Sequence, residues 1–313
     1  MKNKENLFIL IGPTAIGKTE LSINLAKQMN GEIISADSMQ IYKYMNIGSA
    51  KITKEEMQGV QHHLIDNIYP DEDFTVANYK NHATALISDV NKKGKLPIIA
   101  GGTGLYVNSL VYDLQFTEVP PNDNIRNELE YLSNEDLHKE LEKIDKISSD
   151  KLSVNDRKRL IRALEIYKST GKTMSEYNKD FRTENEDYNL VMVGLNMDRA
   201  ELYNRINLRV DIMIKLGLIE EVKGLLEMGY NKNLVSMQGI GYKEIIMYLE
   251  GTLSMDESIA LIKQKTRNYA KRQLTWFRRD SRVKWMNVDN YSDNETLSND
   301  IIEYTMSKMI ISV

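Results

Sequence analysis

The sequence predicts an α/β fold in which helices flank a parallel sheet and a helical insertion interrupts the sheet domain. Short β-rich runs followed by helical periodicity recur through the first third of the chain, which is typical of parallel strands joined by crossover helices. A long polar segment with helical spacing and almost no β signal then separates the third β-rich run from the fourth. With 313 residues, 42% of them hydrophobic, the chain can bury a substantial core in one large domain or two smaller ones.

The β-rich runs and the polar segment give an expected order of elements. The expected strands are residues 7–11, 32–35, 96–100, 190–195 and 283–288. The helical insertion is expected at residues 119–187, so the sheet domain comprises residues 1–118 and 188–313. Pro120 and Pro121 open the insertion and a charged stretch at residues 182–187 closes it, so both ends have the composition of linkers. The chain has no internal repeat.

The composition excludes several kinds of chemistry. The chain has no cysteine, which rules out disulfides, thiolate catalysis and a Cys-ligated zinc site, so any metal must be held by oxygen or histidine. Residues 1–6 are polar and the apolar run at 7–11 is too short for a signal sequence or a membrane span. We therefore expect a cytoplasmic protein with no membrane partner. We also expect it to act as a monomer.

The charge is unevenly distributed. The formal net charge of −4 argues against a generally basic nucleic-acid binder. However, residues 151–172 carry seven basic residues against two acidic ones, and residues 263–282 carry eight against one. Either stretch alone fits a solvated helical face, but two in one acidic protein favour a polyanionic partner.

The strongest motif follows the first expected strand. It has the pattern Gly, four residues, Gly-Lys-Thr, and a helix-forming run comes after it, which is the phosphate-binding loop or P-loop. Its glycines let backbone N–H groups point inward, and the helix N-terminus adds partial positive charge, so the loop can hold a diphosphate. Lys18 can reach the outer phosphate oxygens, and the Thr19 hydroxyl can complete the shell of a Mg²⁺ ion. The loop residues are Gly12, Pro13, Thr14, Ala15, Ile16, Gly17, Lys18 and Thr19.

Two polar residues follow the next strands. Asp37 comes just after the second expected strand and could hold Mg²⁺ through water or accept a proton from a nucleophile. Thr103 lies in a glycine-rich turn after the third strand, and such a turn can also simply start a helix. Because ligands gather at the carboxyl ends of parallel strands, we expect Asp37, Thr103 and the P-loop to share one crevice.

His62 and His63 are adjacent and superficially resemble a metal pair. Neighbouring residues on a strand face opposite sides, and no third ligand has suitable spacing, so we expect a structural role.

Several strings together resemble the tRNA dimethylallyltransferases, in that family's order from residue 7 to about 285. They are residues 12–19, 35–42, 46–51, 62–66, 101–106, 155–165, 238–244 and 265–279. The resemblance implies a P-loop NTPase-like core and the transfer of a prenyl group from dimethylallyl diphosphate to the N6 amine of the adenosine 3′-adjacent to the anticodon. The implied partners are the tRNA anticodon stem-loop and dimethylallyl diphosphate, with Mg²⁺ as cofactor.

The resemblance also implies residue roles. Asp37 would act as general base, Thr103 would lie in the reaction channel, and Arg209 would join the P-loop in holding the diphosphate. A flipped base could be held by Tyr42, Gln40 and Tyr242. The residues matching the family's tRNA contacts are Asp37, Ser38, Met39, Gln40, Thr103, Arg126, Lys158, Arg159, Leu160, Ile161, Arg162, Gln238, Gly239, Ile240, Gly241, Tyr242 and Lys243.

The basic run at 265–279 should pack its aromatics inward and turn its charges toward RNA. Two departures from the family are small: Ile16 replaces a smaller side chain in the loop, and the chain lacks the Cys-His finger of eukaryotic members.

Three other functions remain open from the residues. An adenylate isopentenyltransferase would share the fold but would not need the long basic insertion. A small-molecule P-loop kinase would bind and turn over ATP. A non-enzymatic RNA-binding switch would lose no chemistry when Asp37 is replaced.

Overall fold

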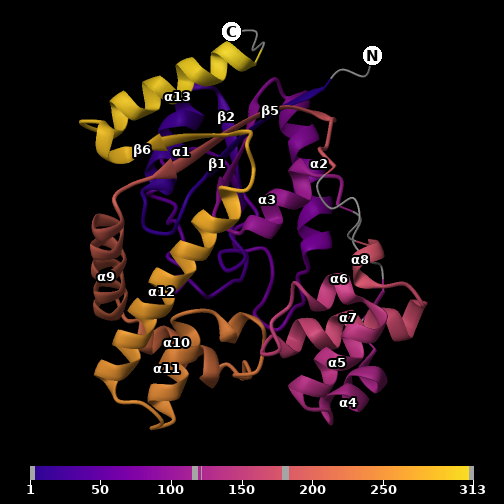
Figure 1. Ribbon diagram of the computed structural model, residues 1–313. Helices are drawn as coiled ribbons and strands as arrows, with labels where there is room; N and C mark the ends of the chain where they lie inside the picture. The colour runs from indigo at the N-terminus through magenta and orange to yellow at the C-terminus, as the bar shows by residue number, and fades with distance from the viewer. Residues whose placement is uncertain (1–3, 115–118, 121, 178–182, 310–313) are drawn as a thin grey trace. The chain divides into compact units, whose positions relative to one another are not determined.

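The computed structural model describes residues 4–114, 119–120, 122–177 and 183–309. The chain divides into two compact units, one formed by Met1–Leu110 with Glu186–Val313 and the other by Val111–Asn185 (Figure 1). The second unit begins earlier than the insertion expected at residues 119–187 and ends two residues before it. Pro121 and Arg182, expected at the two ends of the insertion, lie outside the described residues.

The first unit contains a parallel sheet of six strands in the order β3-β2-β4-β1-β5-β6. The parallel α/β architecture predicted from sequence is confirmed, and all five expected strands are present. The sixth, β3, is a two-residue edge strand that is too short to give a periodic signal. The strands are β1 (Glu5–Ile11), β2 (Gly31–Ala36), β3 (His62–His63), β4 (Leu96–Gly101), β5 (Tyr188–Asn196) and β6 (Val283–Asn287).

Helices cover both faces of this sheet, and β1 is buried on both, as a central parallel strand must be. Phe8 and Leu10 belong to an apolar cluster with residues of several helices, among them α1 (Lys18–Gln28), α9 (Arg199–Lys215) and α13 (Asn294–Lys308). Leu7 and Ile9 alternate with them and point to the other face. There α2 (Val76–Lys92), whose buried residues lie outside that cluster, packs against β1, β2 and β4.

The remaining helices of this unit surround the carboxyl ends of the strands. The long helix α12 packs against α9 and α11, and α10 packs against α11. A capping box between Ser254 and Glu257 fixes where α12 begins. Among the described residues, no helix is long and apolar enough to cross a bilayer. These elements are α3 (Gly104–Val111), α10 (Leu218–Glu227), η1 (Ser236–Gln238), α11 (Tyr242–Leu249), α12 (Met255–Phe277) and η2 (Val288–Asn290).

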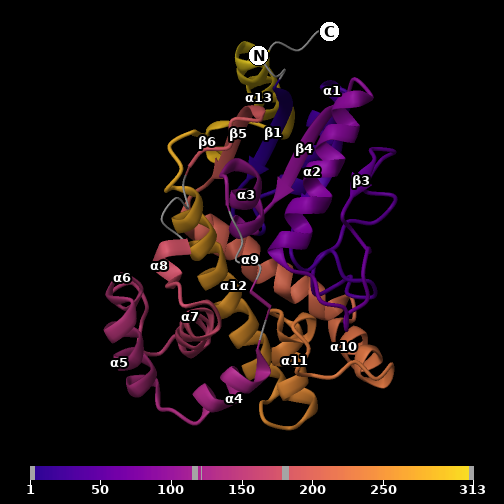
Figure 2. The same cartoon turned by 90° about the vertical axis from the view of Figure 1, so that its right-hand side faces the viewer.

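The second unit is built mainly from helices, and α7 contacts both α4 and α5 (Figure 2). Leucines of α5 and α7 form its apolar core, including Leu137, Leu141, Leu160 and Leu164. Asn122 and Ser133 cap α4 and α5 by accepting hydrogen bonds from backbone N–H groups. The helices are α4 (Asp123–Glu130), α5 (Asn134–Ile144), α6 (Lys146–Ser149), α7 (Arg157–Thr170) and α8 (Met174–Tyr177).

Candidate active site

The P-loop forms the turn from β1 to α1. Gly17 has a φ of 100° and precedes the first residue of α1, so a side chain there would be strained by the backbone conformation alone. Lys18 folds over the loop, and its Nζ donates hydrogen bonds to the carbonyl oxygens of Gly12 at 3.0 Å and Pro13 at 2.8 Å. These two bonds hold the lysine ammonium against the backbone of the loop.

Two cations share the space beside the loop. Burial and the nearby Arg209 guanidinium lower the pKa of Lys18 to about 8, against a smaller opposing effect of the Asp37 carboxylate. Burial also lowers the pKa of Arg209. Within the described part of the chain, the Arg209 guanidinium has no hydrogen-bond partner. Two partly desolvated like charges side by side favour an anion between them.

Asp37 and Thr103 meet at the ends of β2 and β4. The N–H of Thr103 donates to the carbonyl of Ala36 at 3.0 Å, and its Oγ1 accepts from the N–H of Ser38 at 3.0 Å. Asp37 uses Oδ1 to accept the Met39 N–H at 2.8 Å. Its second carboxylate oxygen makes no hydrogen bond to any described residue. The Asp37 carboxylate is therefore fixed in place but keeps an oxygen for a ligand.

Glycine at the end of β4 permits this close approach. A Cβ on Gly101 would lie 2.3 Å from the carbonyl oxygen of Ala36, so no larger residue fits. The glycine-rich turn therefore brings two strand ends into contact, and it also starts α3.

Two adjoining cavities meet at Asp37. The first cavity, of about 400 Å³, is lined by the P-loop from Thr14 to Thr19. The second cavity, of about 340 Å³, is lined by Ser38, Met39 and residues 238–241. Both are lined by Thr14, Asp37, Ser49, Arg209 and Tyr269. One carboxylate thus faces a phosphate-binding loop on one side and a separate chamber on the other.

Two residues of α12 belong to the site but were not found from the sequence. Gln273 is buried; its Oε1 accepts the N–H of Thr14 at 2.9 Å and its Nε2 donates to the carbonyl of Gly102 at 2.9 Å. Tyr269 lines both cavities, and burial and the nearby Asp37 carboxylate raise its pKa to about 12. Their spacing of four residues places both on one helix face, and both fall in the string at 265–279 that resembles the family.

The rest of the basic run on α12 is only partly available to a partner. Phe277 is buried, as predicted. Lys265 pairs with the buried Glu244 at 3.0 Å and Lys263 pairs with Asp211 at 2.6 Å, so these charges are used inside the unit. Arg272 is exposed and lines the second cavity.

The two adjacent histidines have separate partners. His62 Nδ1 lies 2.9 Å from the carbonyl of Val60, and His63 Nε2 lies 2.8 Å from the Glu32 carboxylate. The described residues contain no cluster of three or more His, Asp or Glu able to hold a metal. Each histidine thus has a partner within the protein, and His62 also lines the first cavity, so the structural role of the pair stays a prediction.

The loop at residues 238–243 lines the second cavity, but its tyrosine does not. Tyr242 is fully buried, and Tyr42 is 4% exposed, so neither ring presents a face to a flipped base, which corrects that expectation. Gln40 lines the first cavity and is half-buried. Gln238, Gly239, Ile240 and Gly241 line the second cavity, and Gln238 and Lys243 are exposed.

In the second unit, two of the expected RNA-binding arginines are engaged internally. Arg126 and Arg162 pair with the fully buried Glu165 at 2.8 and 2.6 Å. Burial alone would raise the pKa of Glu165, but hydrogen bonds from Arg162, the Asn122 N–H and Arg126 bring it below its ordinary value.

The other residues of α7 that were expected to contact RNA lie on two different faces of the helix. The side chains of Leu160 and Ile161 lie in the core of the unit, because they fall on the inner face of α7, and so they present no surface to RNA. Lys158 and Arg159 are exposed.

Known proteins with similar sequences and structures were found. A model of the IPP transferase family matches residues 40–280. The tRNA dimethylallyltransferase of Clostridioides difficile (strain 630) is 51% identical over 302 residues, which cover 95% of this chain and 96% of the relative. That of Alkaliphilus oremlandii is 51% identical over 308 residues, covering 96% and 97%.

Solved structures of similar proteins support the same family. The crystal structure of a tRNA isopentenylpyrophosphate transferase from Staphylococcus epidermidis matches with a TM-score of 0.73 and 44% identity, over 97% of this chain and 100% of that one. A eukaryotic dimethylallyltransferase acting on tRNA matches with a TM-score of 0.80 and 28% identity, over 96% of this chain and 80% of that one. The family match covers well over half of the chain; it begins just after Asp37 and includes the glycine-rich turn and α12. This chain belongs to the IPP transferase family, the tRNA dimethylallyltransferases.

Proposed function

We propose that this chain transfers the dimethylallyl group of dimethylallyl diphosphate to N6 of the adenosine 3′-adjacent to the anticodon, using Asp37 at the junction of the two cavities. Membership of the family makes it a tRNA-modifying prenyltransferase. The observation that carries the residue assignment is that Asp37 lines both the phosphate-binding cavity and its neighbour.

The proposed reaction is alkyl transfer, not phosphoryl transfer. The lone pair of the adenine amine forms a bond to the first carbon of the prenyl group, and the carbon–oxygen bond breaks with its electrons going to the diphosphate. The amine proton passes to the Asp37 carboxylate. Because an adenine amine is a weak nucleophile, holding it in line with the breaking bond contributes as much as removing its proton.

The leaving diphosphate would lie in the first cavity. Lys18, Arg209 and the N–H groups at the start of α1 supply positive charge where negative charge builds as the bond breaks. Thr103 holds the Ser38 N–H and so supports the strand end that carries Asp37.

The residues fit a magnesium ion bound with the diphosphate. The Thr19 hydroxyl makes no hydrogen bond to any described residue and lines the first cavity. Since the described residues hold no carboxylate cluster for a metal, diphosphate oxygens and water would supply most of the ligands. When bound, the ion would neutralise charge on the diphosphate.

For the tRNA, two surfaces are proposed. One is the rim of the second cavity at Ser38, Met39 and residues 238–243. The other is the exposed edge of α7 at Lys158 and Arg159, where cations can contact the RNA backbone. We propose that the second unit serves as this RNA-contacting domain.

The decisive experiment supplies purified protein with Mg²⁺, dimethylallyl diphosphate and unmodified tRNA, followed by mass analysis of the nucleosides. We expect one five-carbon group on a single adenosine. Parallel reactions with AMP as acceptor and with ATP as the only phosphate substrate separate the reaction from free-nucleotide prenylation and from kinase activity. No prenylated nucleoside in tRNA, or turnover of ATP instead, would reject the assignment.

A further inference from the structure

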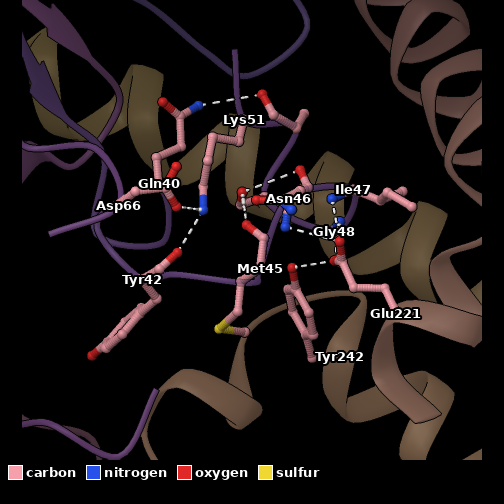
Figure 3. Close-up of polar contacts among 12 residues, drawn as sticks. Gln40, Tyr42, Met45, Asn46, Ile47, Gly48, Lys51, Asp66, Glu221 and Tyr242 are labelled. Carbon is pink, nitrogen blue, oxygen red and sulfur yellow. Dashed lines mark hydrogen bonds and ion pairs between the residues drawn. The ribbon is translucent and has the colours of Figure 1, made fainter. Parts of the chain in front are cut away.

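The carboxylate of Glu221, on α10, accepts four hydrogen bonds from two separate segments of the chain (Figure 3). Its Oε2 accepts the backbone N–H groups of Asn46 at 2.9 Å and Ile47 at 2.7 Å. Its Oε1 accepts the N–H of Gly48 at 3.1 Å and the hydroxyl of Tyr242 at 2.8 Å. Three successive N–H groups thus converge on one anion, which in this protein is a side chain of the same unit.

The two segments joined by Glu221 both lead into the second cavity. Gly48, Ser49 and Ala50 line it, and so do residues 238–241. The latter directly precede Tyr242, the first residue of α11. Glu221 itself does not line this cavity. Its contacts therefore fix how far apart two parts of the cavity lining are, without touching what the cavity holds.

Packing makes the contact between these segments rigid. A Cβ on Gly48 would lie 2.6 Å from the ring of Tyr242, so only glycine allows this approach. Tyr242 is fully buried. Burial and the Glu221 carboxylate raise the pKa of the Tyr242 hydroxyl well above its ordinary value, so it remains a hydrogen-bond donor.

The far end of the same segment is also fixed. Lys51 is buried, and its Nζ donates to the carbonyl of Tyr42 and to the Asp66 carboxylate, each at 2.5 Å (Figure 3). Ser49 Oγ donates to the carbonyl of Met45 at 2.6 Å. Lys51 fixes the C-terminal end of residues 46–51 and Glu221 fixes the N-terminal end, so this segment is held at both ends.

We propose that Glu221 is a positioning residue for the nucleic-acid substrate: it holds residues 48–50 and 238–241 at the separation that lets the target base reach Asp37. This inference rests on the proposed function, because it assigns the second cavity to the adenosine. It adds Glu221, and through it Tyr242, to the residues on which RNA recognition depends.

The test compares Glu221→Gln with Glu220→Gln. Both lose one negative charge from α10, but Glu220 is exposed. The amide of Glu221→Gln cannot accept from four donors at once and turns an N–H₂ toward backbone N–H groups. We expect its affinity for an anticodon stem-loop RNA, measured by fluorescence anisotropy without prenyl donor, to fall roughly tenfold, since several charge-assisted bonds are lost.

The same variant should keep its KM for dimethylallyl diphosphate within about twofold, because no contact of Glu221 reaches the P-loop. Glu220→Gln should match the wild type for both substrates. Tyr242→Phe removes one donor and leaves the carboxylate, so it should weaken RNA binding less than Glu221→Gln and in the same selective way.

Two results would overturn the proposal. One is unchanged RNA affinity in Glu221→Gln or Tyr242→Phe with a wild-type melting temperature. The other is an equal loss for RNA and for the prenyl donor, which indicates a purely structural role. Because RNA binding is measured without catalysis, failure of wild-type prenyl transfer would reject the proposed function separately.

Discussion

Gln273 accepts a hydrogen bond from the backbone N–H of Thr14, 259 positions away in the sequence, with a nitrogen–oxygen distance of 2.9 Å. The same amide donates to the carbonyl of Gly102, so one side chain of α12 joins the P-loop to the turn after β4. The amide occupies one N–H of the phosphate-binding loop and fixes the loop against the strand end that carries the glycine-rich turn.

Replacing Gln273 with alanine should therefore weaken diphosphate binding and stability together. The Thr14 N–H and the buried Gly102 carbonyl lose their partner, at a cost of about 2 kcal/mol or more in the free energy of unfolding. Urea unfolding and the KM for dimethylallyl diphosphate measure the two effects. Gln264→Ala, an exposed position on the same helix, is the matched control. A wild-type KM in a folded Gln273→Ala variant would contradict the role of this amide.

Replacing Asp37 with asparagine or alanine should separate chemistry from binding. Asparagine keeps the Oδ1 that accepts the Met39 N–H, so the turn should stay in place. We expect turnover to fall roughly a hundredfold or more, while tRNA affinity stays within a few-fold. Single-turnover transfer rates and RNA binding check both parts, and unchanged turnover would remove Asp37 from the mechanism.

The depressed pKa of Lys18 predicts a pH dependence. The free enzyme holds Lys18 charged below pH 8 and neutral above it, so kcat/KM for dimethylallyl diphosphate should fall as pH rises through about 8. Arg209→Gln removes the neighbouring positive charge, so the Lys18 pKa should rise and the fall should move to higher pH. A pH profile of that variant with an unshifted inflection would exclude this coupling.

The same shift affects stability in the opposite direction. Because the folded-state pKa of about 8 lies below the ordinary 10.5, the charged lysine opposes folding below pH 8, and this penalty disappears as pH rises toward 10.5. Lys18→Met should therefore be inactive yet more stable than the wild type at pH 7. Equal or lower stability by chemical unfolding would contradict this reasoning.

The Mg²⁺ concentration that the reaction requires should depend on the hydroxyl of Thr19. Thr19→Ala removes the hydroxyl proposed to complete the metal shell, so the Mg²⁺ concentration for half-maximal transfer should rise, and Thr19→Ser should restore it. Titration of Mg²⁺ after treatment with EDTA provides the measurement. Identical titration curves for alanine and serine would exclude the hydroxyl as a ligand.

Substitutions on α7 should distinguish residues that contact RNA from residues that stabilise the fold. Lys158→Ala with Arg159→Ala removes two exposed cations and should weaken tRNA binding and flatten its dependence on salt, with little effect on stability. Arg162→Ala instead leaves the buried Glu165 carboxylate with fewer partners and should cost about 2 kcal/mol or more. Parallel salt slopes for the double variant and the wild type would refute the RNA contact.

The sequence by itself determined the elements whose signal is local. A strand, six residues of loop and a helix give the P-loop a continuous pattern, and Asp37 and Thr103 were located because each follows a recognisable strand. Parallel strands align their carboxyl ends, so the approach of Asp37 and Thr103 at one edge could be predicted, but Thr103 is not among the residues that line the two cavities. Strand alternation also predicted that the two histidines have different partners, as His62 with Val60 and His63 with Glu32 do.

Only the tertiary structure decided which side chains face the cavities and which are buried or paired with other residues of the protein. Gln273 binds Thr14, 259 positions away, and Glu221 binds Ile47, 174 positions away, and no local pattern records such pairs. The family resemblance implied RNA contacts for Tyr242 and Leu160, yet each side chain is fully buried. The physical reason is that a polar or aromatic side chain takes its role from the donors, acceptors and apolar surfaces packed around it, and folding alone brings those together.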